Sequence, residues 1–255
     1  MDIVTLIGIL FTLTCIVAGF VLEGGRVIAL LQLTPALIVI GGTIGALIIS
    51  FPWNTLKNIP KVLKVAFTTQ HSDLNSYIEY FKNVSTKTRK EGLLSIESDL
   101  SNSNINPFIK NGLQMVVDGL DSDHIKNVLT VKLEQASNRH DKFIEVFSAA
   151  GGYAPTMGIV GTITSLVIIL SNLNDAASLG PKIAIAFIAT LYGLGTANIF
   201  WLPIANKLKE IDRQEINEKE LFIEAIILIL EGSNPNNVVN KLQCFLPENQ
   251  QKTIN

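Results

Sequence analysis

Two apolar segments of this 255-residue chain concentrate hydroxyl and glycine residues at spacings that could support ion chemistry. They are Thr156, Gly158, Gly161, Thr162, Thr164 and Ser165 in the first segment, and Thr190, Gly193, Gly195 and Thr196 in the second. Glycines three or four apart let helices approach closely, and threonine hydroxyls can bond a neighbouring helix or a partly hydrated ion. The same hydroxyls can instead bond a carbonyl of their own helix. Helix packing and ion contact are both open from these residues alone.

The apolar segments lack the charged side chains and the histidine that usually carry ions through a membrane protein. None of the four apolar cores contains Asp, Glu, Lys, Arg or His. A protein that moves ions alone usually keeps an intramembrane ionisable group. We therefore expect no conduction by this chain without a partner. A self-contained secondary transporter, one alternative, would show such a charge or inverted repeats, and neither is found.

The polar parts of the chain carry no recognisable active site. His71, His124 and His140 are too far apart in sequence for a helical metal-binding motif, and Cys15 and Cys244 form no CxxC pair. Phosphate-binding and hydrolase signatures are missing. We predict a protein that is not an enzyme, with no metal site and no cofactor.

The charges are placed very unevenly along the chain. Residues 1–51 and 146–203 contain five of them, Asp2, Glu23, Arg26, Asp175 and Lys182, although the whole chain has 20 basic and 22 acidic side chains. Uncharged stretches at 3–22, 33–51, 147–173 and 183–203 are each about as long as a bilayer core requires. The sequence therefore predicts four membrane-spanning helices.

Basic residues indicate how the spans are oriented. Lys57, Lys61 and Lys64 follow the second span, and further basic residues follow the fourth. The positive-inside rule then places both termini and the long segment after the second span in the cytoplasm, as in a multi-pass membrane protein. A net charge of −2 with no basic run gives no reason to expect nucleic-acid binding.

The cytoplasmic segments have helical periodicity. Apolar residues recur at three and four residue intervals from Leu74 and again from Ile105, and Asp121 to Asp123 offers an N-cap for a helix that runs into the third span. The run Leu221 to Leu230 is too short to cross a bilayer and is expected to be a buried helix face. The predicted fold is all-α, with transmembrane helices at 1–51 and 146–203, a cytoplasmic helical domain at 52–145 and a cytoplasmic C-terminal helix and tail at 204–255.

Ordered motifs across the whole chain resemble the MotA family of flagellar motor stator subunits. They are GYAPTMGIVGT at 152–162, AFIATLYG at 186–193, EGG at 23–25, GGT at 41–43, ANIFWLPIANK at 197–207, EGSNP at 231–235 and FLP at 245–247. The resemblance implies a homo-oligomeric ring of five subunits in the lipid membrane, around two copies of a single-span MotB-type partner whose aspartate carries the ion, proton or sodium. It also implies contact with the rotor protein FliG.

The resemblance assigns roles to six residues. It implies that Thr162 and Thr190 face the ion pathway, and that Pro155 and Pro203 couple ion passage to conformational change. It implies that Arg89 and Glu97 contact FliG. If one helix spanned these two charges they would lie on one broad face, but Gly92 between them can break that helix.

Three alternatives to a stator subunit remain from the sequence. An energy transducer of the ExbB/TolQ kind has three spans and a different topology. The secondary transporter is disfavoured by the missing charge. A membrane scaffold without ion flux would keep the small-residue packing but has no need for the Thr162 and Thr190 pattern.

Overall fold

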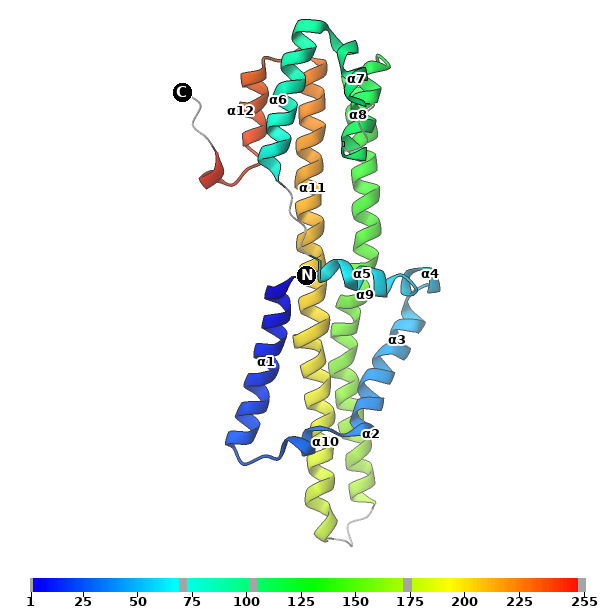
Figure 1. The fold of residues 1–255 in the computed structure, drawn as a ribbon. Helices are drawn as coiled ribbons and strands as arrows, with labels where there is room; N and C mark the ends of the chain where they lie inside the picture. Colours follow the sequence, from blue (N-terminus) through cyan, green and yellow to red (C-terminus); the bar gives the residue numbers. More distant parts are fainter. Residues whose placement is uncertain (1, 69–72, 101–104, 172–175, 252–255) are drawn as a thin grey trace. The chain divides into compact units, whose positions relative to one another are not determined.

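The chain is helical throughout the residues that the computed structural model describes, which are 2–68, 73–100, 105–171 and 176–251. Contacts divide it into two compact units (Figure 1). We call residues 1–69 and 140–210 the membrane unit, and residues 70–139 and 211–255 the polar unit. Two long helices, α9 (Ser122–Leu170) and α11 (Leu202–Leu230), contribute residues to both.

Four helical segments are long and apolar enough to cross a membrane, as predicted. The first is α1 (Ile3–Leu22), and the third is the C-terminal part of α9. The second consists of η1 (Val27–Leu30), α2 (Leu33–Ala36), η2 (Leu37–Gly41) and α3 (Gly42–Ser50). The fourth consists of α10 (Ala176–Thr196), η4 (Ala197–Trp201) and the beginning of α11.

The second and fourth spans each contain a π-helical stretch, η2 and η4, that hydrophobic periodicity does not reveal. The two stretches meet at Val39 and Ala197, which pack with Ala154 of α9 and are buried from solvent. A π-helical turn inserts an extra residue into the α-helical ladder and is frequently found at functional positions. The second, third and fourth spans therefore meet where η2 and η4 pack against Ala154, the residue before Pro155.

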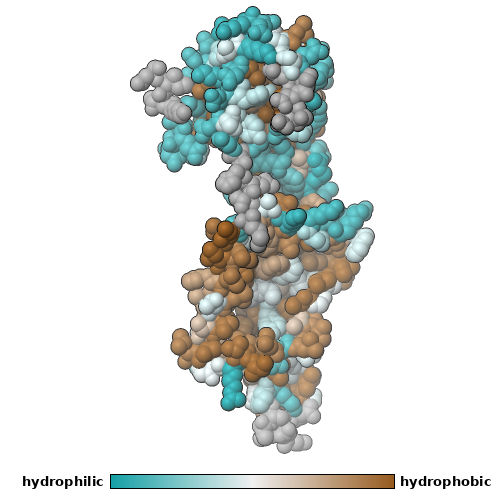
Figure 2. Space-filling view, viewed as in Figure 1, coloured by the Kyte–Doolittle hydropathy of each residue, from teal (hydrophilic) through white to brown (hydrophobic). Residues whose placement is uncertain are grey.

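The outer surface of the membrane unit is apolar (Figure 2). No residue of α1 is buried, and Val4 and Phe11 expose 79% and 69% of their surface. An apolar surface of this extent marks contact with a membrane or with other protein.

The start of α1 is held by polar contacts. At its start the Asp2 backbone N–H donates to the Phe67 carbonyl oxygen at 2.9 Å, and the Asp2 carboxylate forms an ion pair with Lys207 of α11. Phe67 follows α5 (Ile59–Ala66), which with α4 (Trp53–Leu56) carries the basic residues after the second span. These contacts tie the first span to the segments that follow the second and fourth.

The polar unit has its own hydrophobic core. Its elements are α6 (Leu74–Glu91), η3 (Leu93–Ile96), α7 (Glu97–Leu100), α8 (Pro107–Val117), α12 (Pro235–Gln243), η5 (Glu248–Gln250) and the adjoining parts of α9 and α11. Phe222 of α11 lies at the centre, fully buried, with ring centroids of Tyr77 and Phe81 at 4.7 Å and 5.9 Å. The buried face predicted for Leu221 to Leu230 is confirmed, and α12 covers α6 in addition.

The predicted start of the longest helix is also confirmed. The Asp121 carboxylate accepts a hydrogen bond from the His124 N–H at 2.9 Å, and α9 continues from Ser122 for 49 residues through Pro155. Gly119, at φ +77°, ends the preceding helix in a conformation that glycine adopts without strain. One helix therefore joins the polar unit to the third span in sequence.

We expect Phe222→Ala to destabilise the polar unit by about 3–5 kcal/mol, because it removes a fully buried ring at the centre of the core. Leu94→Ala is the matched control. Leu94 is 69% exposed in the same unit, so its truncation should change stability by about 0.5 kcal/mol or less. Thermal unfolding of the detergent-purified protein measures both, and equal losses would contradict this description of the core.

Candidate functional site

Helices α9 and α10 touch through their backbones at two glycines. A Cβ added at Gly193 would lie 2.6 Å from the Ala154 carbonyl oxygen, and a Cβ added at Gly158 would lie 2.9 Å from the Ala189 carbonyl oxygen. Real Cβ atoms do not approach backbone atoms so closely. Because both positions are glycine, the third and fourth spans can pack closely at this point.

This close contact brings the two predicted threonines together. The Oγ1 atoms of Thr162 and Thr190 lie 2.6 Å apart, within hydrogen-bonding distance. Thr162 Oγ1 also lies 2.9 Å from the Ala186 carbonyl oxygen and 3.1 Å from that of Gly158. Since a hydroxyl carries one proton, Thr162 can donate to one of these carbonyls while it accepts a hydrogen bond from Thr190.

Three other membrane threonines behave differently. Thr43, Thr164 and Thr196 each donate to the carbonyl four residues back in their own span, at 2.6, 2.8 and 2.8 Å. Such bonds satisfy the hydroxyl locally and carry no contact between helices. Packing therefore explains these three threonines, whereas Thr162 and Thr190 form a connection between two spans.

The threonine pair offers oxygen atoms but no titratable group. Both side chains are half-buried, and Thr190 Oγ1 keeps lone pairs that no donor among the described residues occupies. These can accept a hydrogen bond or contact a cation. The pair can thus assist an ion, but the charge that binds it has to come from another molecule.

The two predicted prolines lie near two irregular features of the spans, the close contact between α9 and α10 and the π-helical stretch η4. Pro155 is at the contact with Gly193, where an added Cβ would come within 3.1 Å of the proline Cα. It has no N–H to donate to the Gly151 carbonyl, which weakens α9 there. Pro203 is the second residue of α11, just after η4, and lines a cavity of about 290 Å³ with Thr5, Asn198 and Lys207. Their role in motion stays a prediction.

Arg89 and Glu97 do not share a helix. Gly92, at φ +86°, follows the end of α6, and Glu97 begins α7. Because the chain turns at this glycine, as the sequence allowed, the two charges do not lie on one face of a continuous helix. Both side chains are exposed, and the described residues contain no ion pair for either.

The segment that contains both charges is nevertheless held in place. Lys87 Nζ donates to Ser98 Oγ at 2.8 Å across the turn, and Ile96 is fully buried in the core. Leu94, between the two charges, points to solvent. The structure thus presents Arg89 and Glu97 on a supported surface of the polar unit.

One contact of the membrane unit escaped the sequence reasoning. The Tyr192 hydroxyl donates to the Leu30 carbonyl oxygen at 2.5 Å and accepts from the Gln32 N–H at 3.2 Å. A tyrosine in the middle of an apolar span is the only sequence signal for it, since a buried hydroxyl normally finds a partner. The partners themselves lie 160 residues away and could not be inferred.

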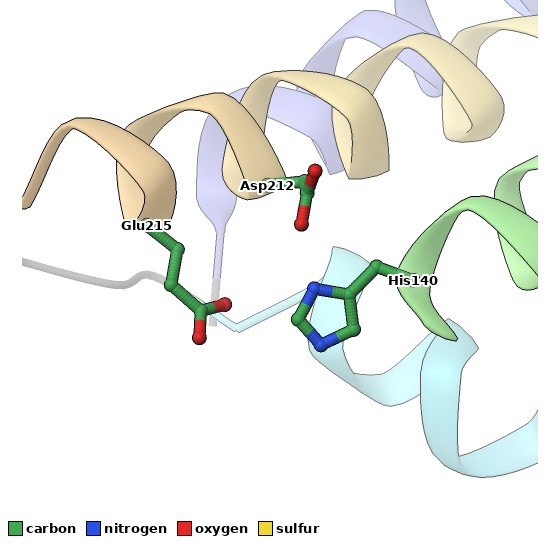
Figure 3. Close-up of side chains that lie close together, drawn as sticks. All are labelled: His140, Asp212 and Glu215. Carbon is green, nitrogen blue, oxygen red and sulfur yellow. The ribbon is translucent and has the colours of Figure 1, made fainter. Parts of the chain in front are cut away.

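Acidic side chains on α11 were also not anticipated. Figure 3 shows Asp212 and Glu215 of α11 with His140 of α9. Asp212 is buried and accepts a hydrogen bond from Ser137 at 2.8 Å, and Glu215 pairs with Lys219. His140 belongs to the membrane unit and the two acids to the polar unit, so we assign no metal site to them. His71 lies outside the described residues.

Known proteins match this chain over nearly its whole length. The sequence profile of the MotA/TolQ/ExbB proton channel family matches residues 100–221, and that of the motility protein A N-terminal region matches residues 6–92. Motility protein A of Bacillus subtilis is 36% identical over 248 residues, which cover 97% of this chain and 92% of that protein. The chain belongs to the MotA family.

Solved structures of the MotA family have the same fold. The chain matches a structure of the flagellar MotAB stator complex from Bacillus subtilis with a TM-score of 0.90 and 36% identity, over 96% of each chain. It matches a structure of C. jejuni MotAB with a TM-score of 0.92 and 30% identity, over 98% of each chain. The arrangement described above is therefore that of a MotA-family subunit from end to end.

We expect Gly193→Ala to destabilise the membrane unit by about 1–3 kcal/mol, because its methyl group would press against the Ala154 backbone and force α9 and α10 apart. Gly195→Ala is the control, since a Cβ there meets nothing within 4 Å and alanine favours the helix. Thermal unfolding in detergent compares the two. Equal stability of both variants would show that the helices do not need this contact.

Proposed function

We propose that this chain is the MotA-type subunit of a flagellar stator, which with a MotB-type partner conducts ions across the bacterial inner membrane and converts their flow into torque on the rotor. The observation that carries the proposal is the match of the whole chain to MotAB stator structures. A hydroxyl pair between two spans that contain no Asp or Glu supports it, because such a chain needs a partner with a carboxylate. The subunit is a motor component rather than an enzyme.

In this proposal the partner's carboxyl group carries the ion past Thr190. A protonated carboxyl can donate its proton in a hydrogen bond to the free lone pairs of Thr190 Oγ1, and a sodium ion can be coordinated by the same oxygen. Thr162 holds the Thr190 hydroxyl in place through the hydrogen bond between them. Both proton and sodium are compatible with two hydroxyls, so the driving ion depends on the partner.

The assembly that we propose is the one that the family resemblance implies. Five copies surround two copies of the single-span partner, both termini lie in the cytoplasm, and Arg89 and Glu97 face FliG. The exposed apolar surface of the membrane unit supports burial against lipid and neighbouring copies. The whole-length match does not favour the energy-transducer alternative of the ExbB/TolQ kind.

We expect ion flux in reconstituted vesicles only when the MotB-type partner is present, and roughly a ten- to hundredfold loss of that flux in the Thr162→Val, Thr190→Val double variant. The loss reflects the removal of hydrogen bonds to a charged or strongly polar group. Because both members of the pair become apolar and keep their shape, folding should change little.

Thr164→Val is the matched control, because its hydroxyl bonds only the Val160 carbonyl of its own helix. Its flux should equal that of the unaltered complex. Flux through the chain alone would overturn the division between the two subunits. Full flux through the double variant at equal protein levels would return Thr162 and Thr190 to a packing role.

We expect the Arg89→Glu, Glu97→Lys double reversal to abolish most swimming at normal stator levels, since attraction to the rotor becomes repulsion at each contact. Single neutralisations should be mild, because one exposed ion pair contributes only about 0.2–1 kcal/mol. Charge reversal of the facing FliG residues should partly restore motility.

The matched control reverses two other exposed charges of the polar unit, Glu79→Lys with Lys126→Glu. It makes the same change in charge types and should swim normally. Normal swimming of the Arg89 and Glu97 reversal with the unaltered rotor would mean that these side chains are only solvated surface.

A further inference from the structure

The hydroxyl of Tyr192 joins the fourth span to the short segment between η1 and α2 near the start of the second span, which we call the connection. It donates to the Leu30 carbonyl oxygen at 2.5 Å and accepts from the Gln32 N–H at 3.2 Å, and so it spans the break between η1 and α2. No side chain caps α2, so the tyrosine supplies the polar contact at its beginning. One phenol thus serves two backbone groups that helical hydrogen bonding leaves unpaired.

The surroundings of this contact are apolar. A cavity of about 500 Å³ beside it is lined by Leu30, Gln32, Ile188 and Leu191 among other residues, and nearly all of its lining side chains are hydrocarbon. Unpaired backbone groups are costly where water is scarce. If the connection shifted along α10, the Leu30 carbonyl and the Gln32 N–H would lose their hydrogen bonds to Tyr192. These two bonds therefore hold the connection in place.

Tyr192 and Thr190 make their hydrogen bonds on different sides of α10. Two residues along an α-helix correspond to a rotation of about 200°, so the two side chains leave the helix in nearly opposite directions. Thr190 bonds Thr162 of α9, and Tyr192 bonds the connection. Rotation of α10 about its own axis would have to break one of these contacts.

We propose that Tyr192 is a positioning residue that fixes the rotation of α10, so that Thr190 continues to face Thr162. Its effect on ion flux rests on the proposed function, whereas its effect on the orientation of α10 does not. Without the phenol hydroxyl the connection no longer holds this face of α10, and Thr190 samples orientations that do not meet α9.

A disulfide cross-link tests the orientation directly. In a chain with Cys15→Ala and Cys244→Ala, the pair Thr162→Cys and Thr190→Cys should oxidise readily, because the two side chains meet in the structure. Adding Tyr192→Phe should slow cross-linking by roughly three- to tenfold, the effect of losing about one hydrogen bond. An unchanged rate would overturn the proposal.

Tyr153→Phe is the matched control. It also removes one phenol hydroxyl that joins two spans, since Tyr153 bonds Ser50 at 2.9 Å, but this hydrogen bond does not involve α10. It should leave the cross-linking rate unchanged. An equal slowing by Tyr153→Phe would mean that any lost contact loosens the unit, which would also overturn the specific role of Tyr192.

Ion flux with the MotB-type partner tests the consequence. Tyr192→Phe should reduce flux by roughly three- to tenfold in the unaltered background and cause no further loss when Thr190→Val is already present, because it acts through Thr190. Equal fold losses in both backgrounds would indicate general packing and contradict the proposal. If the unaltered complex conducts nothing, the proposed function fails, and the cross-linking result still decides the role of Tyr192.

Discussion

The membrane unit depends on one backbone contact, between α9 and α10 at Gly158 and Gly193. Lipid is as apolar as the side chains it covers, so spans are held by close packing and hydrogen bonds rather than by exclusion of water. The two glycines allow both, because the helices come close enough for the threonine hydroxyls to meet. The buried meeting point of η2, η4 and Ala154 lies beside this contact. A side chain at either glycine would therefore disturb the site and the packing together.

The polar unit is stabilised in a different way. Its core is built from aromatic and aliphatic side chains around Phe222, as in a water-soluble domain. The turn at Gly92 is anchored to that core through Ile96, so Arg89 and Glu97 can change without loss of buried contacts. Substitutions at these charges can thus alter a surface and leave the fold intact.

Much of the fold follows from the sequence, because span length and helical periodicity depend on local composition. The four spans, the Asp121 cap and the buried face at Leu221 to Leu230 were all predictable in this way. The pairing of Thr162 with Thr190 needed the family resemblance, since other membrane threonines bond their own helices. The π-helical turns and the Tyr192 contact were not predictable, because they depend on which distant segments meet in space.

The chemistry of threonine has a consequence for how the motor responds to its surroundings. A threonine hydroxyl does not titrate in the range where proteins are folded, so the charge of the Thr162 and Thr190 pair is zero at every working pH. Under the proposed function, this chain provides a conduit whose electrostatics are constant, and any acid or alkaline limit on conduction belongs to the partner's carboxylate. Cells could then adapt a stator to a new external pH by altering the smaller subunit alone.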